Sequence, residues 1–194
     1  FLSKKAAEIK AERVVMCGVR FMAESVKILS PETETILPVA TATCPMAEQI
    51  APERVRKFKE ENPNTEVVAY INTTAALKAE CDVCVTSSSA IKIVEKLPAE
   101  EILFIPDQHL GSFVQKSVPE KKFILWDGYC LVHAQLTKED VLKCKAEYPD
   151  AVFAVHPESP KEVVELADMV GATSEIISYA KSQKGKVIIG TERG

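Results

Sequence analysis

Short apolar segments alternate with amphipathic segments along most of the chain. Segments 66–72, 101–107 and 151–157 are rich in Val, Ile, Phe and Tyr and predict buried strands. Segments 52–62 and 138–148 carry apolar side chains at helical spacing and predict helices. Hairpin turn signals do not separate the strands. This alternation predicts an α/β fold with parallel sheets and helices on both faces.

The same pattern occurs twice at a spacing of 86 residues, without a gap. The shift superposes identical residues along the whole unit, among them Cys44 and Cys130, Asp82 and Asp168, and Ile102 and Ile188. Because the hydrophobic pattern and the turn residues agree as well as the identities, we infer a repeated unit.

Residues 1–43 have the helix and strand order of the back half of such a unit. We therefore expect three units: the C-terminal part of a first unit at 1–43, a second at 44–129 and an incomplete third at 130–194. The expected fold class is a pseudo-threefold arrangement of three-layer α/β/α domains, with the first and third incomplete. Both ends of the chain look cut, and the period predicts a third equivalent cysteine near position 216.

Ligands of parallel α/β sheets bind beyond the carboxyl ends of the strands. Each cysteine is followed after 26 residues by a polar strand end, at Tyr70 or His156, and after 17 more by a hydroxyl, at Ser87 or Thr173. Equivalent strand ends of pseudo-symmetric units are expected to converge on one central cleft.

The six cysteines suggest different roles. Cys44 and Cys130 lie in turns at equivalent positions, which favours a shared metal-ligand role over two structural thiols. Two thiolates are too few for a closed zinc or iron site. Cys81 and Cys84 form a C-x-x-C pair, but their repeat counterparts Ala167 and Val170 are apolar, so core packing is favoured. We expect Cys17, within a strand, and Cys144, within a helix, to be inert fillers.

The remaining polar residues allow two interpretations. His156 and Glu158 could share proton transfer, or be a satisfied histidine and a helix cap. Ser87 and Thr173 are expected to cap helices and also to bind phosphate or carboxylate. Ser159, Pro160 and Glu162 predict a capping box. His109 and His133 could each contact a metal or substrate directly, but a hydrogen bond to a group that does so is favoured.

Composition narrows the function classes. The net charge of −4 gives no basic footprint for nucleic acid, and small-molecule chemistry is the better expectation. The chain has no run of eighteen apolar residues, and its N-terminus alternates apolar and charged residues rather than resembling a signal peptide. We therefore expect a cytoplasmic protein that binds neither nucleic acid nor membrane.

Together these segments resemble the quinolinate synthase (quinolinate synthetase A) family. The resemblance covers essentially the whole chain, through CGVRFMAES, C-x-MAEQI, YINTTAALKA, TSSSA, PDQHLG, WDGYCLVH, HPES, VGAT and GTERG. It implies three pseudo-equivalent domains around a central cavity. The family's upstream His and Tyr motif and its third cysteine match nothing here and are expected outside these termini.

The resemblance also implies a cofactor and a reaction. A [4Fe–4S] cluster would be held by three cysteines, of which Cys44 and Cys130 match two, and its open iron would act as a Lewis acid. The enzyme would condense iminoaspartate with dihydroxyacetone phosphate to quinolinate, with loss of phosphate and two waters. Carried over by motif, the catalytic residues are Tyr70, His156 and Glu158. The substrate-binding residues are Tyr70, Ile71, Asn72, Ser87, His156, Pro157, Glu158 and Thr173.

Two other interpretations stay open. The chain could be a truncated or non-catalytic relative whose cysteines bind zinc or nothing, acting as a small-anion or metal-binding module. It could also be a hydro-lyase for another substrate. An aspartate oxidase or dehydrogenase upstream is a further partner that the resemblance suggests.

Overall fold

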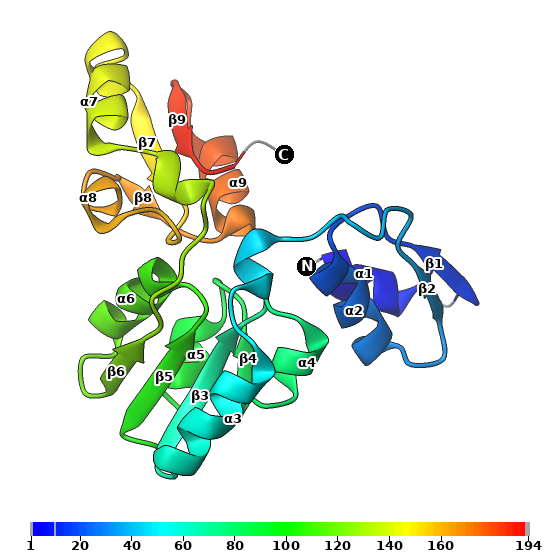
Figure 1. Ribbon diagram of the computed structural model, residues 1–194. Coiled ribbons are helices and arrows are strands. Elements are labelled where there is room, and N and C mark those ends of the chain that lie inside the picture. The colour runs from blue at the N-terminus through cyan, green and yellow to red at the C-terminus, as the bar shows by residue number, and fades with distance from the viewer. Residues whose placement is uncertain (1, 10, 193–194) are drawn as a thin grey trace.

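The strands form three separate parallel sheets in the computed structural model, which describes residues 2–9 and 11–192. Figure 1 shows the three units as distinct bodies, running from blue through green to red along the chain. Every strand pairing among these residues is parallel, and helices connect the strands. The expected α/β class with parallel sheets is thereby confirmed.

The second unit has four strands in the order β4-β3-β5-β6. Its elements in chain order are η1 (Pro45–Glu48), α3 (Pro52–Glu61), β3 (Thr65–Tyr70), α4 (Ala75–Lys78), β4 (Val83–Val85), α5 (Ala90–Val94), β5 (Glu101–Ile105), α6 (Gln108–Ser117) and β6 (Lys122–Leu125).

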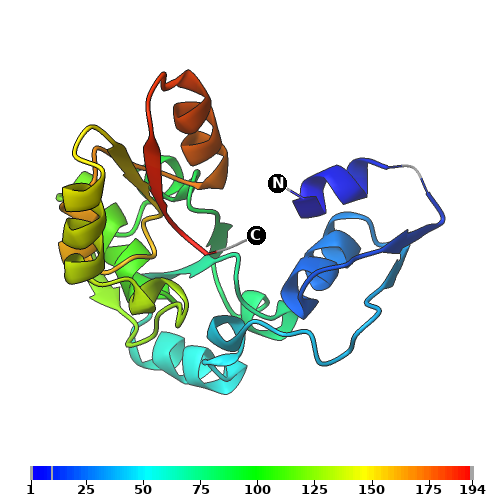
Figure 2. The same ribbon diagram turned by 90° about the horizontal axis from the view of Figure 1, so that it is seen from above.

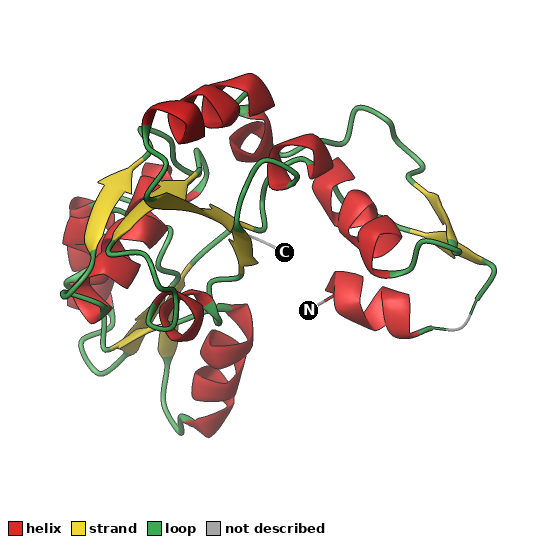
Figure 3. Cartoon of the chain, turned by 90° about the horizontal axis from the view of Figure 1, so that it is seen from below, coloured by secondary structure: helices red, strands yellow, loops and turns green. Residues whose placement is uncertain are grey.

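Both faces of this sheet are buried, as parallel sheets require. Alternate side chains of β3 point to opposite faces, so Val68 and Tyr70 pack under α5 and α6 while Val67 and Ala69 pack under α3 and α4. Tyr70 stands at the carboxyl end of its strand, on the face that also carries both turn cysteines. The helices lie outside the strands in Figure 3.

The third unit has three strands in the order β8-β7-β9. Its elements are η2 (His133–Gln135), α7 (Lys138–Glu147), β7 (Val152–Val155), α8 (Lys161–Val164), β8 (Met169–Val170), α9 (Thr173–Ser182) and β9 (Val187–Gly190). Thr137 begins α7 with a capping box to Asp140.

The repeat is visible in individual contacts. In the second unit Lys59 Nζ lies 2.6 Å from Asp82 Oδ1, and the Val67 N–H donates to Asp82 Oδ2 at 2.8 Å. These contacts fasten the turn before β4 to the helix and the central strand. The third unit repeats them at 3.5 and 2.7 Å, with Lys145, Asp168 and Phe153 in the equivalent places.

The third strand of the unit departs from the ungapped alignment. Glu66 pairs with Ile102 in the second unit, whereas the equivalent Val152 pairs with Val187 in the third. The expected match of Ile102 with Ile188 is therefore wrong by one residue. The third unit is one residue shorter between its second and third strands.

The first unit contains α1 (Leu2–Glu8), β1 (Arg13–Val15), α2 (Arg20–Leu29) and β2 (Glu34–Ile36). Figure 2 shows it as a separate body, joined to the second by the segment that leads to Cys44. Cys17 does not lie within a strand, because β1 ends at Val15, and its side chain is exposed. The expectation of a buried filler is wrong at this position. No described helix combines the length and apolar character needed to cross a membrane.

Candidate functional site

The turn that carries Cys44 enters the second unit at η1. The Cys44 carbonyl accepts the Ala47 N–H at 2.9 Å, and the half-buried Cys44 thiol packs against the same apolar cluster as Tyr70 and Cys130. Burial raises the pKa of the Cys44 thiol, and the charges of Cys130 and Glu158 raise it further, against backbone N–H groups that lower it. Cys44 and Cys130 therefore face a common centre.

The turn that carries Cys130 is held by a hydrogen bond from the turn that carries Cys44. Gln49, directly after η1, donates from Nε2 to the Tyr129 carbonyl at 3.1 Å. A Cβ at Gly128 would lie 2.5 Å from Gln49 Oε1 and 2.5 Å from the Pro106 carbonyl, closer than any real contact. Glycine is therefore needed for the two turns to meet.

Asp107 joins this turn to the start of α6. One carboxylate oxygen caps the helix by accepting the Leu110 N–H at 2.7 Å, and the other accepts the Cys130 N–H at 3.0 Å. The side chain is fully buried. Burial raises the pKa of Asp107 to about 7, with the charge of Glu158 adding to it and the backbone N–H groups opposing it.

His156 and Glu158 follow β7 at its carboxyl end and are both buried. The Glu158 N–H donates a hydrogen bond to His156 Nδ1 at 3.4 Å. Burial lowers the pKa of His156 despite the nearby Glu158 charge. Burial would raise the pKa of Glu158, but interactions with His133, His156 and Tyr70 outweigh it and the pKa falls. The carboxylate is thus held charged beside a neutral imidazole.

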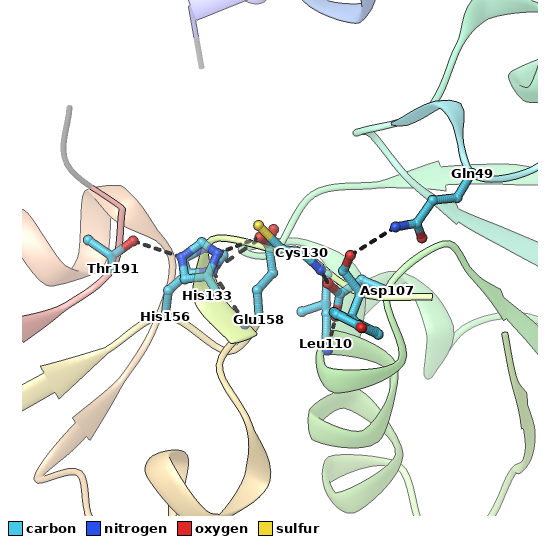
Figure 4. A network of polar contacts seen from close by, with 9 residues as sticks. Gln49, Asp107, Leu110, Cys130, His133, His156, Glu158 and Thr191 are labelled. Carbon is cyan, nitrogen blue, oxygen red and sulfur yellow. Dashed lines mark hydrogen bonds and ion pairs between the residues drawn. The ribbon is translucent and has the colours of Figure 1, made fainter. Parts of the chain in front are cut away.

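His133 lies at the centre of the site. Its Nδ1 is 3.0 Å from Glu158 Oε2, its Nε2 is 3.0 Å from Thr191 Oγ1, and its ring stacks on His156 at 5.1 Å (Figure 4). Burial acts to lower the pKa of His133, but Cys130 and Glu158 raise it to about 10. The short contact with Glu158 is poorly aligned, so Nδ1 has no hydrogen-bond partner among the described residues.

Three potential metal donors converge here. One ligand atom each from Cys130, His133 and Glu158 lie within 4.8 Å of one another, and all three residues are buried. Figure 4 shows the Cys130 sulfur beside the Glu158 carboxylate and the His133 ring. Cys44 is outside this set. Thiolate, imidazole and carboxylate are ligands that Zn²⁺ and Fe²⁺ accept.

Tyr70 reaches the same carboxylate from the second unit. Burial raises the pKa of its phenol well above the ordinary value, with the charge of Glu158 and a hydrogen bond to it adding and Ser87 opposing. Ile71 and Asn72 follow Tyr70 in the turn after β3, where Ile71 packs against the core and Asn72 is half-buried. A neutral phenol next to a carboxylate is suited to proton transfer.

A cavity of about 240 Å³ lies between the second and third units. Ser87 and Pro157 line it from opposite sides, together with Ala172 and Glu175 at the start of α9. Thr173 is the first residue of that helix; it is exposed, and it is not among the lining residues. Of the two predicted anion-binding hydroxyls, the structure thus brings only Ser87 into the cavity wall.

The predicted helix caps are wrong at three positions. Ser89 precedes α5 and Ala172 precedes α9, so neither Ser87 nor Thr173 is an N-cap. Pro160 precedes α8 without a side-chain cap, so the predicted capping box at Ser159 does not form. The Ser159 N–H instead bonds the His156 carbonyl at 3.0 Å, and the side chain is buried in that turn.

Other expectations are met or corrected more simply. Cys81 donates to the Leu77 carbonyl at 3.1 Å, and Cys81 and Cys84 pack against the apolar cluster under α3, as expected for core residues. His133 makes the expected hydrogen bond to another side chain, and it also lies among the potential ligands. His109 stands apart from them, half-buried and 6.0 Å from the Tyr129 ring.

Sequence reasoning missed Gln49, Asp107 and Thr191. All three lie in the segments C-x-MAEQI, PDQHLG and GTERG quoted above, and this was the one signal that could have drawn attention to them. Their partners are 80, 23 and 58 residues away in the chain, which no local spacing reveals.

Comparisons with known proteins agree with these motifs. The sequence model of the family described as "Quinolinate synthetase A protein" matches residues 1–194. The quinolinate synthases of Caldicellulosiruptor saccharolyticus, Aquifex aeolicus and Clostridioides difficile are 53%, 51% and 51% identical to the chain, over its whole length. The chain spans 64%, 60% and 64% of the length of these relatives.

Proposed function

Because the chain belongs to the quinolinate synthetase A family, we propose that it supplies part of the active site of a quinolinate synthase. The reaction condenses iminoaspartate with dihydroxyacetone phosphate and releases phosphate and two waters. The relatives are longer than the chain, so the activity belongs to the whole protein. A cytoplasmic location and an upstream aspartate oxidase or dehydrogenase stay predictions.

Cys44 and Cys130 would hold a [4Fe–4S] cluster. The donor set fits, because two thiols from equivalent turns share one apolar surface and the charge of one acts on the other. When bound, such a cluster with an open iron supplies a Lewis acid that polarises a substrate oxygen. Gln49 and Asp107 keep the two turns in place for it.

Tyr70 and Glu158 would move the proton. The Glu158 carboxylate is charged and buried, so it can accept a proton from a substrate carbon held next to it. The Tyr70 phenol stays neutral and can donate to a developing oxyanion. The positive charge of His133 balances the Glu158 carboxylate while it is unprotonated.

The remaining predicted residues would orient the substrates. His156 is neutral, and with Nδ1 accepting the Glu158 N–H its proton lies on Nε2, which leaves a donor for a carboxylate or carbonyl. Ser87 offers a hydroxyl for phosphate or carboxylate oxygens in the cavity that it shares with the start of α9. Asn72 and Thr173 are assigned to substrate binding on the family motif.

One observation carries the proposal: Cys44, Cys130, Tyr70 and Glu158, from both repeated units, act on one another at a single centre. A zinc-binding or inert relative would not need a phenol–carboxylate pair there. The cavity lined by Ser87 adds room for a substrate beside that pair.

Anaerobic reconstitution of the whole protein, with the third cysteine that is expected outside this chain, tests the cofactor. We expect a brown protein with about four irons and four sulfides per chain, and loss of both in Cys44→Ser and Cys130→Ser. Cys84→Ser, a half-buried core thiol, is the matched control and should retain the cluster. A colourless protein, or a cluster that survives Cys44→Ser, would contradict the assignment.

A quinolinate assay with the same preparations tests the chemistry. Glu158→Gln keeps the shape of the side chain but cannot accept a proton, so turnover should fall by about 100-fold or more at unchanged iron content. Formation of a different product from iminoaspartate and dihydroxyacetone phosphate would favour a hydro-lyase of another kind.

A further inference from the structure

The buried side chains of Cys130, His133 and Glu158 form a second arrangement of donors that does not involve Cys44. Their ligand atoms lie within 4.8 Å of one another, and at most 9% of any of these residues is exposed. A metal ion that displaced the protons of Cys130 and His133 would meet a thiolate, an imidazole and a carboxylate, and its charge would balance the two anions.

His133 is oriented as a metal-bound histidine is. Thr191 Oγ1 lies 3.0 Å from Nε2, and Nδ1 lies 3.0 Å from Glu158 Oε2, so the near ring nitrogen and the carboxylate face the same space. A metal ion bound there would take the place of the Nδ1 proton. Nδ1 is buried and lacks a hydrogen-bond partner in residues 2–9 and 11–192. A hydrogen-bond acceptor on the far ring nitrogen orients a ligating histidine, and the Thr191 hydroxyl can serve as that acceptor.

The other two donors are also held from behind. The Cys130 N–H bonds Asp107, which fixes the turn, and Glu158 is positioned by its own N–H on His156. The His156 ring stacks on His133 with an interplanar angle of 27°. The three ligand atoms therefore need little rearrangement to bind an ion.

We propose that the cluster-free protein binds one Zn²⁺-like ion through Cys130, His133 and Glu158, with a fourth position open. Three protein ligands and an open position form a common coordination set for zinc. The inference does not rest on the proposed function, because it requires neither Cys44 nor a further cysteine. Since Cys130 would serve both groups, the single ion and the cluster exclude each other.

Cobalt substitution tests the site. The chain is freed of metal with chelator, kept reduced and anaerobic, and titrated with Co²⁺ while the visible and near-ultraviolet absorption is recorded. We expect one equivalent of Co²⁺ to bind, with visible bands of four-coordinate cobalt and a sulfur-to-cobalt charge-transfer band. Adding Zn²⁺ should displace the Co²⁺ and remove both sets of bands.

Variants separate this site from the cluster. Cys130→Ser should abolish the charge-transfer band, and His133→Ala should weaken Co²⁺ binding at least 100-fold. Thr191→Val should weaken it about ten- to hundredfold, as loss of an outer hydrogen-bond partner does. Cys44→Ser is the matched control, which should bind Co²⁺ with an unchanged spectrum although it cannot build the cluster. Circular dichroism identifies any variant that is unfolded.

Two outcomes would overturn the inference: wild-type protein that takes up no stoichiometric Co²⁺ with a thiolate band, or folded Cys44→Ser that loses binding as Cys130→Ser does. Iron and sulfide analysis is a separate measurement. A whole protein that binds Co²⁺ but assembles no cluster would therefore refute the cofactor proposal and leave this site intact.

Discussion

At the scale of single residues, the six cysteines occupy distinct environments that should give them different reactivity. Cys17 is exposed after β1, whereas Cys81 is half-buried and bonded to the Leu77 carbonyl. Burial raises the pKa of Cys81 to about 12, with the nearby thiolate and carboxylate charges adding to it. A thiol reacts with alkylating agents as the thiolate, so its protonation limits the rate.

We expect iodoacetamide at pH 8 to label Cys17 first and Cys81 last. The rate at Cys81 should be lower by a factor of about 100 or more, since few of its thiols ionise at that pH. Peptide mass spectrometry at timed intervals measures both rates in one sample, without substitutions. Equal labelling of the two positions would show that the packing around Cys81 opens readily.

Residue chemistry was predictable from sequence where repeat symmetry supplied a comparison. Cys81 and Cys84 were assigned to the core because Ala167 and Val170 occupy the equivalent places, and they do pack there. Asp107 was not assigned, because an aspartate before a helix looks like an ordinary cap. Its second bond, to the Cys130 N–H, depends on the fold.

At the scale of elements, Asp168 links the turn before β8 to the central strand of its sheet. Its Oδ2 accepts the Phe153 N–H at 2.7 Å, and this bond lowers the pKa of the carboxyl, with Lys145 contributing more weakly. Because the folded pKa is depressed, the stabilisation is present above the ordinary pKa of 3.8 and is lost as the pH falls through the lower value.

We expect Asp168→Ala to lower the free energy of unfolding at pH 7 by about 1 kcal/mol, because the Phe153 N–H loses its acceptor. The difference from wild type should shrink below pH 4. Urea unfolding at pH 7 and pH 3 gives both values. Asp150→Asn, on the exposed turn before β7, is the control and should behave as wild type at both pH values.

Element order and type were predictable, but register was not. The alternation of apolar and amphipathic segments identified β3, β5 and β7 and the helices around them. The one-residue shift at β9 escaped because Val187 and Ile188 are both aliphatic, so either could fill the place of Ile102. The Ser159 box failed because the backbone of Ser159 had already closed a turn on His156.

At the scale of the whole molecule, the three sheets differ in how well they are protected. The six residues of β3 are nearly all buried, whereas β1 and β2 have three residues each and are partly exposed. Amide exchange reports the free energy of local opening, which falls where few apolar contacts cover the backbone.

Hydrogen exchange should therefore be slowest in residues 65–70 and 101–105 and distinctly faster in 13–36. Mass spectrometry of peptic peptides resolves these segments. If the amides of all three units exchanged at the same rate, the whole chain would instead open as one cooperative body.

The convergence of strand ends on one centre was predictable from parallel topology combined with the repeat of the unit. The clamp between the two cysteine turns was not, since Gln49 and Tyr129 are 80 residues apart and carry no complementary pattern. That clamp is closed over Gly128, where an added carbon would strike Pro106 and Gln49 at 2.5 Å.

A methyl group at position 128 would thus act as a wedge. It would push one sulfur-bearing turn away from its counterpart while leaving every sulfur, carboxylate and imidazole chemically intact. The separation of the two thiols thus depends on the absence of a side chain at Gly128. A substitution there would disrupt the centre without changing any of its donor groups.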